Sequence, residues 1–124
     1  MAKPAVLAIG MDPAWVDLQG HPEITPDIVR RYIETEIERL RAGGYDATTC
    51  QIEPGEAAET TVRGALSSRR FDCVVVGAGL REPPSLLLLF EQVINLVHAL
   101  APQARICFNT TPADTTEAVQ RWLK

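Results

Sequence analysis

The sequence predicts one α/β domain of three layers, in which helices cover both faces of a four-stranded parallel sheet. Three observations support this prediction. Segments typical of strands and segments typical of helices alternate four times along the 124 residues. The run FDCVVV, Phe71–Val76, is continuous and β-branched, as in strands buried on both faces of a parallel sheet. No repeat, low-complexity segment or boundary divides residues 1–124 into two domains.

Four segments are predicted to form the strands. The second is more polar than the others, which favours a position at an edge of the sheet. In chain order the strands are expected at Ala5–Ile9, Tyr45–Glu53, Phe71–Val76 and Ala104–Phe108. Because connections between parallel strands are right-handed, the expected strand order is 2-1-3-4, a shortened form of the flavodoxin-like or Rossmann-like arrangement.

Four helices are predicted to follow these strands. The first begins at Pro26 with Thr25 as its N-cap, and the Gly43-Gly44 pair ends it. The second follows Gly55 and ends at Arg70, the third covers residues 84–100, and the fourth begins near Asp114. Asp114 and Glu117 have the spacing of a capping box, and we expect Val119, Trp122 and Leu123 to be buried by this last helix.

Composition indicates a globular protein, with 46% hydrophobic and 23% charged residues. A net charge of −4 argues against nucleic acid or an anionic membrane as the main partner. No apolar run approaches the ~20 residues of a membrane span, and MAKPAVLAIG lacks the features of a signal peptide. The cysteines Cys50, Cys73 and Cys107 form no CxxC motif and are expected to be reduced and packed. We therefore predict a cytoplasmic protein.

The carboxyl ends of the strands are the predicted binding site, because ligands of open α/β sheets bind there, beside the switch in strand order. Each predicted strand is followed by glycines or polar residues. The candidate ligand-binding residues at these ends are Gly10, Gly77, Gly79, Arg81, Asn109 and Thr110. The last two begin a hydroxyl-rich segment beside a helix start, so they would donate to a ligand or serve as caps and turn residues.

The segment GAGLREPP, which begins at Gly77, is the candidate anion site. Its glycines would allow close approach of a ligand, the start of a helix attracts anions, and Arg81 would grip a phosphate or carboxylate. The dinucleotide-binding motif is incomplete, since Glu82 occupies the place of the third glycine. The alternative is a tight turn in which Glu82 pairs with Arg81, while Pro83 and Pro84 remove two backbone donors.

The connection from Met11 to Thr25 is longer than the ~2–6 residues usual between a strand and a helix. It contains the two candidate catalytic residues, Asp12 at a strand end and His21 as an acid–base group. The alternatives are that Asp12 caps its own turn and that His21 lies in a plain turn. Asp12 and Glu53 alone do not make a magnesium site, so no metal is predicted.

The predicted helix at 84–100 is more apolar than a helix that covers one face of a sheet needs to be. The surplus indicates either a deep core or a surface shared with a second subunit, so a homodimer is the predicted assembly.

Over nearly its whole length the chain resembles small flavodoxin-like and receiver-like domains, at the level of fold only. The functional motifs of those families are absent: Gly77 stands where a receiver has its phosphoacceptor aspartate, and Gly10-Met11-Asp12-Pro13 replaces the phosphate loop of a flavodoxin. The stretches LFEQVINLVHALAP and ICFNTTPADTTEAVQRW are together similar to short uncharacterised proteins; this resemblance brings no activity with it and leaves the cofactor open.

Two functions follow as hypotheses. The first is binding of a small anionic ligand through Asp12, Arg81 and Asn109, with enzymatic activity left open. The second is a non-catalytic homodimeric interaction module that uses the helix at 84–100.

Overall fold

The computed structural model describes residues 2–123 and has the predicted four-stranded parallel sheet. The strands are β1 (Ala5–Met11), β2 (Asp46–Ile52), β3 (Cys73–Val76) and β4 (Arg105–Phe108). Their order is β2-β1-β3-β4, and every neighbouring pair is parallel. Both the strand order and the edge position of β2 are therefore confirmed.

Helices follow every strand, as predicted. They are α1 (Pro26–Ala42), α2 (Ala57–Ser67), α3 (Ala78–Arg81), α4 (Leu87–Leu100) and α5 (Thr115–Trp122), with single 3₁₀ turns η1 (Pro13–Trp15) and η2 (Pro84–Leu86). Within residues 2–123, none of these helices combines the length and the apolar character that crossing a bilayer requires. The short α3 was not predicted, and η2 precedes α4 because the two prolines at 83 and 84 interrupt the helix.

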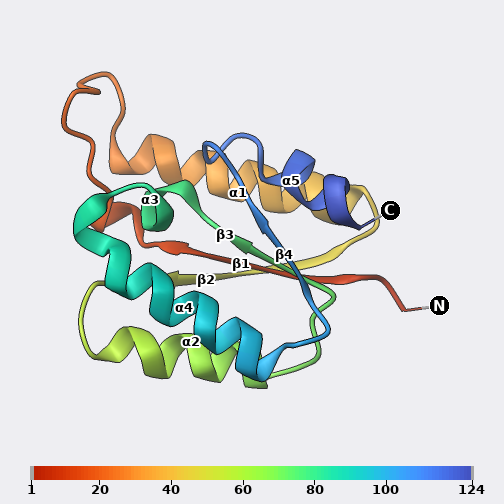
Figure 1. Cartoon of the computed structure of the whole chain (residues 1–124). Helices are drawn as coiled ribbons and strands as arrows, with labels where there is room; N and C mark the ends of the chain where they lie inside the picture. Colours follow the sequence, from red (N-terminus) through yellow and green to blue (C-terminus); the bar gives the residue numbers. More distant parts are fainter. Residues whose placement is uncertain (1, 124) are drawn as a thin grey trace.

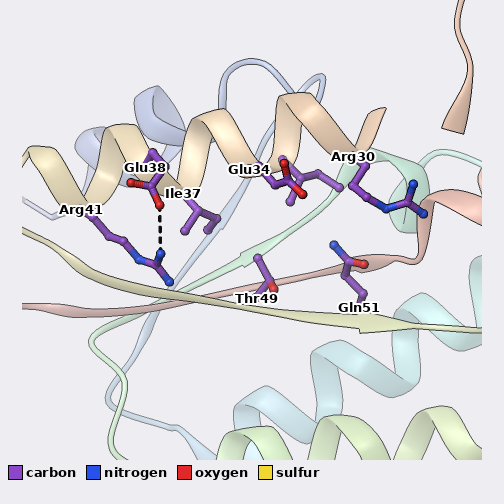
Figure 2. Close-up of a pocket in the computed structure, with 8 residues that line it drawn as sticks. Arg30, Glu34, Ile37, Glu38, Arg41, Thr49 and Gln51 are labelled. Carbon is purple, nitrogen blue, oxygen red and sulfur yellow. Dashed lines mark hydrogen bonds and ion pairs between the residues drawn. The ribbon is translucent and has the colours of Figure 1, made fainter. Parts of the chain in front are cut away.

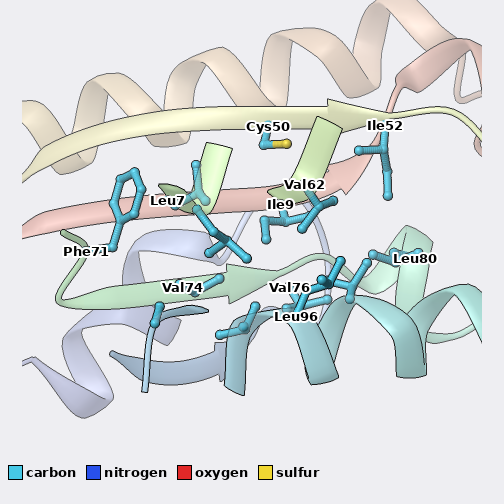
Figure 3. Packing of buried hydrophobic residues seen from close by; sticks show 14 of the residues in the cluster. Leu7, Ile9, Cys50, Ile52, Val62, Phe71, Val74, Val76, Leu80 and Leu96 are labelled. Atoms are coloured by element: carbon cyan, nitrogen blue, oxygen red, sulfur yellow. The ribbon is translucent and has the colours of Figure 1, made fainter. Parts of the chain in front are cut away.

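The helices form the two outer layers of the predicted sandwich. α1 and α5 cover one face of the sheet, and α2 and α4 cover the other (Figure 1). Alternate residues of a strand point to opposite faces, so the central strands supply both cores. On the α2 and α4 side the strands contribute Leu7, Ile9, Val74 and Val76 (Figure 3); on the α1 and α5 side they contribute Val6, Cys73, Val75 and Cys107. All four residues of β3 are buried.

The apolar faces of α2 and α5 show how well periodicity predicted the packing. In α2, the buried residues are Ala58, Val62 and Leu66, spaced one helical turn apart. In α5, Val119 is buried as expected, but Trp122 is 56% exposed. The prediction for Trp122 was wrong because α5 ends at this residue, so no further turn packs over its side chain.

A buried carboxylate joins the first long helix to the last one. Glu36 of α1 is 3% exposed; its Oε1 accepts a hydrogen bond from the Thr116 amide at 2.9 Å, and its Oε2 accepts one from Arg39 Nη1 at 2.7 Å. The predicted capping box is wrong, since Asp114 makes no side-chain cap bond and Glu117 pairs with Arg39 at 3.3 Å. Glu36 therefore caps α5 from another element of the fold.

We predict that Glu36→Ala lowers the free energy of unfolding by about 1–3 kcal/mol, because the buried Thr116 amide loses its acceptor. Glu36→Gln retains an acceptor oxygen and should cost less. Urea unfolding followed by circular dichroism measures both changes. The matched control is Glu34→Ala, an exposed glutamate of the same helix. Equal stability of the Glu36→Ala and Glu34→Ala variants would contradict the capping role.

Candidate functional site at the carboxyl edge of the sheet

The carboxyl ends of all four strands meet at one edge of the sheet, on the left of Figure 1, where α3 also lies. Gly10 and Gly77 are neighbours at this edge: the Gly77 amide donates to the Ile9 carbonyl at 2.9 Å, and a Cβ on Gly77 would lie 3.6 Å from the Gly10 Cα. Neither glycine has a positive φ. Their contribution is therefore the absence of side chains at the switch between β1 and β3, and not an unusual backbone conformation.

Asn109, directly after β4, is 7% exposed and uses both ends of its amide within the protein. Its Oδ1 accepts from the Ala78 amide at 2.7 Å, and its Nδ2 donates to Thr115 Oγ1 at 3.0 Å. Asn109 thus ties the first residue of α3 to the first residue of α5. Two roles were predicted for Asn109, a donor to a ligand or a cap, and this arrangement corresponds to the cap.

Arg81, the last residue of α3, is half-buried and carries the most distinctive group at this edge. Its Nη2 donates to the Asn109 carbonyl at 3.0 Å, and its guanidinium carbon lies 5.6 Å from the centre of the Phe108 ring. Its Nε is buried without a hydrogen-bond partner. Within residues 2–123 no acidic side chain forms an ion pair with Arg81, and this includes the neighbouring Glu82.

The backbone amides at the start of α3 are mostly occupied. The Gly77 amide bonds to the sheet, the Ala78 amide to Asn109, and the amides of Leu80 and Arg81 to the Gly77 carbonyl. Of the first residues of α3, only Gly79 has an amide with no partner in the described chain. An anion at this edge would consequently be held by the Arg81 guanidinium more than by the helix start.

Asp12 lies on the β2 side of this edge and closes its own turn. Its amide donates to the Ile52 carbonyl at 2.8 Å, and its Oδ1 accepts from the Ala14 amide at 2.9 Å, which caps η1. No hydrogen bond or ion pair between described residues joins Asp12 to Arg81 or Asn109. The structure therefore places Asp12 at the predicted edge, but in the capping arrangement that the sequence allowed as an alternative.

His21 occupies a turn of the long loop, which projects past the amino end of α1 and away from the sheet (Figure 1). The side chain is exposed, and its Nδ1 lies 4.0 Å from Glu23 Oε1. Trp15, in the same loop, is also exposed; Val16 makes the packing contact instead, against Gly79. The loop thus reaches the site through Val16, and His21 is not brought to the other candidates.

Thr110 is engaged in a turn with Asp114. The amides of Thr110 and Thr111 donate to Asp114 Oδ1 at 2.9 and 3.1 Å, and the Thr110 hydroxyl donates to Oδ2. Partial burial raises the pKa of Asp114, but these hydrogen bonds lower the pKa by more than burial raises it. The pKa of Asp114 therefore lies below its ordinary value. Thr110 therefore stabilises the connection between β4 and α5.

Across residues 2–123 no three His, Cys, Asp or Glu side chains gather closely enough to hold a metal ion. The three cysteines are free and buried. Cys73 and Cys107 have their sulfurs 3.5 Å apart, and the hydrogen bond between them together with burial raises the pKa of the Cys73 thiol.

Two hollows of the surface lie away from the predicted residues. One, of about 320 Å³, lies between α1 and β2 (Figure 2). The other, of about 550 Å³, lies at the amino end of the sheet beside Lys3, Arg69 and Arg70. The sequence predicted no site at either hollow. The sequence did contain a signal for the hollow between α1 and β2, because the polar residues Thr49 and Gln51 alternate along β2 on the side that faces α1.

No protein-family model matches the chain, and the search of curated proteins found no significant similarity.

We predict that Asn109→Ala lowers the free energy of unfolding by about 1–3 kcal/mol, because it leaves the Ala78 amide buried without an acceptor. Urea unfolding measures the change. Asn95→Ala on the exposed side of α4 is the matched control and should be neutral or slightly stabilising, since alanine favours helix. If both variants had the same stability as the parent, Asn109 would not be the tie between α3 and α5.

Proposed function

We propose that the protein binds a small carboxylate- or phosphate-bearing ligand at the carboxyl edge of its sheet, with Arg81 as the charged contact. One observation carries the proposal: the half-buried guanidinium of Arg81 has no acidic partner, and its Nε has no acceptor. Withdrawing a cation from water without a counter-charge is unfavourable. An anionic ligand that contacts the accessible part of the guanidinium would supply the missing charge.

The surroundings of Arg81 favour recognition of a planar or tetrahedral anion. The Asn109 carbonyl holds Nη2 and the Phe108 ring lies beside the guanidinium, so the side chain is already ordered before a ligand arrives. A guanidinium binds carboxylate and phosphate oxygens in its own plane. Gly10 and Gly77 carry no side chains at the neighbouring strand ends, whereas Val16 packs against Gly79. The proposed recognition element is thus Arg81, an arginine already held in place, beside strand ends that carry glycine.

The proposal concerns binding, and catalysis by Asp12 or His21 stays a prediction. Asp12 caps η1, and His21 lies in the projecting loop, so neither contacts the Arg81 and Asn109 cluster. We place the protein in the cytoplasm because three buried thiols without a disulfide suit a reducing compartment.

A thermal-shift screen tests the ligand proposal with inorganic phosphate, citrate, sugar phosphates, nucleotides and flavin mononucleotide. A ligand present at about ten times its Kd should raise the Tm by about 4–6 °C, and Arg81→Ala should abolish the shift. Arg70→Ala is the control, because Arg70 is an exposed arginine near the opposite end of the sheet and forms no ion pair with residues 2–123. A shift that survives in Arg81→Ala, or no shift with any compound, would refute the proposal.

A second candidate function, a homodimeric interaction module, is favoured by the first turn of α4. Leu87 and Leu88 are 55% and 79% exposed there. The neighbouring Leu86 and Leu89 pack against the core, so most of the surplus apolar character of this helix serves the fold. The candidate contact surface of the helix at 84–100 therefore narrows to two adjacent leucines.

We predict that Leu88→Glu converts a dimer into a monomer, because a charge at the centre of an apolar contact cannot be desolvated cheaply. Light scattering coupled to size exclusion measures the mass. Gln92→Glu, one turn further along the same exposed side of α4, is the control for added charge and should leave the mass unchanged. A parent protein that is already monomeric at high micromolar concentration would eliminate this function.

A further inference from the structure

β2 is an edge strand whose outward backbone groups are largely unpaired. The N–H and C=O groups of successive residues in a strand point alternately to the two sides. The Asp46 amide bonds to the Pro4 carbonyl and the Ile52 carbonyl accepts from Asp12, so the even-numbered residues of β2 face β1. The backbone groups of Ala47, Thr49 and Gln51 consequently point away from the sheet. Arg41 Nε covers only one of them, the Ala47 carbonyl, at 3.2 Å.

The hollow of about 320 Å³ lies directly over this open edge. α1 provides one wall through Arg30, Glu34, Glu38 and Arg41, with Ile33 and Ile37 as the apolar part, and β2 provides Thr49 and Gln51 (Figure 2). A segment that added to β2 as a new strand would place every second side chain on the face of the sheet where the hollow lies. The open edge and the hollow are thus two parts of one potential peptide site.

The charges along the hollow follow the order Arg41, Glu38, Glu34, Arg30 (Figure 2). Arg41 pairs with Glu38 at 3.1 Å, and Arg30 pairs with Asp27 outside the hollow at 2.8 Å. Glu34 has no ion-pair partner in the described chain. The two carboxylates therefore lie in the middle of the hollow between its two arginines. Glu34 is unpaired and would attract a basic side chain, while Glu38 shares its charge with Arg41.

This charge order disfavours a second copy of the chain as the occupant. Two copies that paired their β2 edges across a two-fold axis near Thr49 would bring their α1 helices together in opposite directions. Arg41 of one copy would then approach Arg30 of the other, and Glu38 would approach Glu34. Like charges in such positions oppose association.

We propose that the β2 edge binds an extended peptide segment with basic residues at positions i and i+2. The peptide backbone would bond to Thr49 and Gln51, and its two basic side chains would enter the hollow beside Glu34 and Glu38. The spacing fits, because glutamates one helical turn apart are separated by about 6 Å and alternate residues of a strand by about 6.8 Å. This is strand addition to a sheet edge, and it is independent of the Arg81 site.

The test uses the full-length protein and a fluorescent heptapeptide in which valine and lysine alternate, with anisotropy as the readout. Saturable binding is expected, and a peptide in which glutamate replaces lysine should not bind. Glu34→Lys should weaken binding by about five- to tenfold, which corresponds to roughly 1 kcal/mol for a partly exposed charge contact. Glu91→Lys makes the same charge change on α4, where Glu91 is exposed, and should leave the affinity within about twofold.

Two further measurements separate strand addition from simple charge attraction. A lysine peptide that is N-methylated at the amides expected to face β2 keeps its charge and should lose binding. Thr49→Pro removes an outward amide without touching the bonds to β1, so it should also abolish binding while the circular dichroism spectrum is retained. The proposal is overturned if the methylated peptide binds as well as the parent peptide, or if Glu34→Lys and Glu91→Lys have equal effects.

Discussion

The two central strands, β1 and β3, are buried on both faces, and the placement of every other element follows from their pairing. All four residues of β3 are buried, and Val6 and Leu7 of β1 point into opposite cores. Helices must therefore lie on both sides; right-handed connections send α1 to one side and α2 and α4 to the other, and α5, which follows the last strand, completes the layer beside α1 (Figure 1). The same pairing sets Gly10 beside Gly77 at the carboxyl edge. The location of the ligand site is thus a consequence of how the core is buried.

Hydrophobic periodicity was sufficient to predict the strands and the long helices, because burial on one or two faces leaves a local pattern. The strand order followed from the handedness of the connections and from the polarity of β2. It could not predict Glu36, since a glutamate in a helix is assigned to the surface although position 36 falls on the buried side with Ile37 and Leu40. Its partner, the Thr116 amide, is 80 residues away in sequence. At the candidate site, the position of Asn109 was predicted, but its bonds depend on α3, a four-residue helix with no periodicity of its own.

The two outermost strands of the sheet, β2 and β4, differ in how their open sides are protected against pairing with another strand. β4 has four residues, and Arg121 Nη2 covers its outward Phe108 carbonyl at 2.9 Å. β2 has seven residues, and Arg41 covers only the Ala47 carbonyl. Short strands and covering cations are the usual devices against unwanted pairing. β2, the longer of the two strands, is therefore the less protected one. The charges on α1 would select which segments can pair with it, in place of complete covering.

The Thr116 amide near the start of α5 is capped by Glu36, a residue of α1, so the last helix depends on the first long helix for its cap. During synthesis Glu36 leaves the ribosome 80 residues before the amide that it will cap. Until then water solvates the carboxylate. The carboxyl-terminal helix α5 would then be the last element to gain its cap. A nascent chain that ends before α5 would expose both the carboxylate and the apolar cluster beside it.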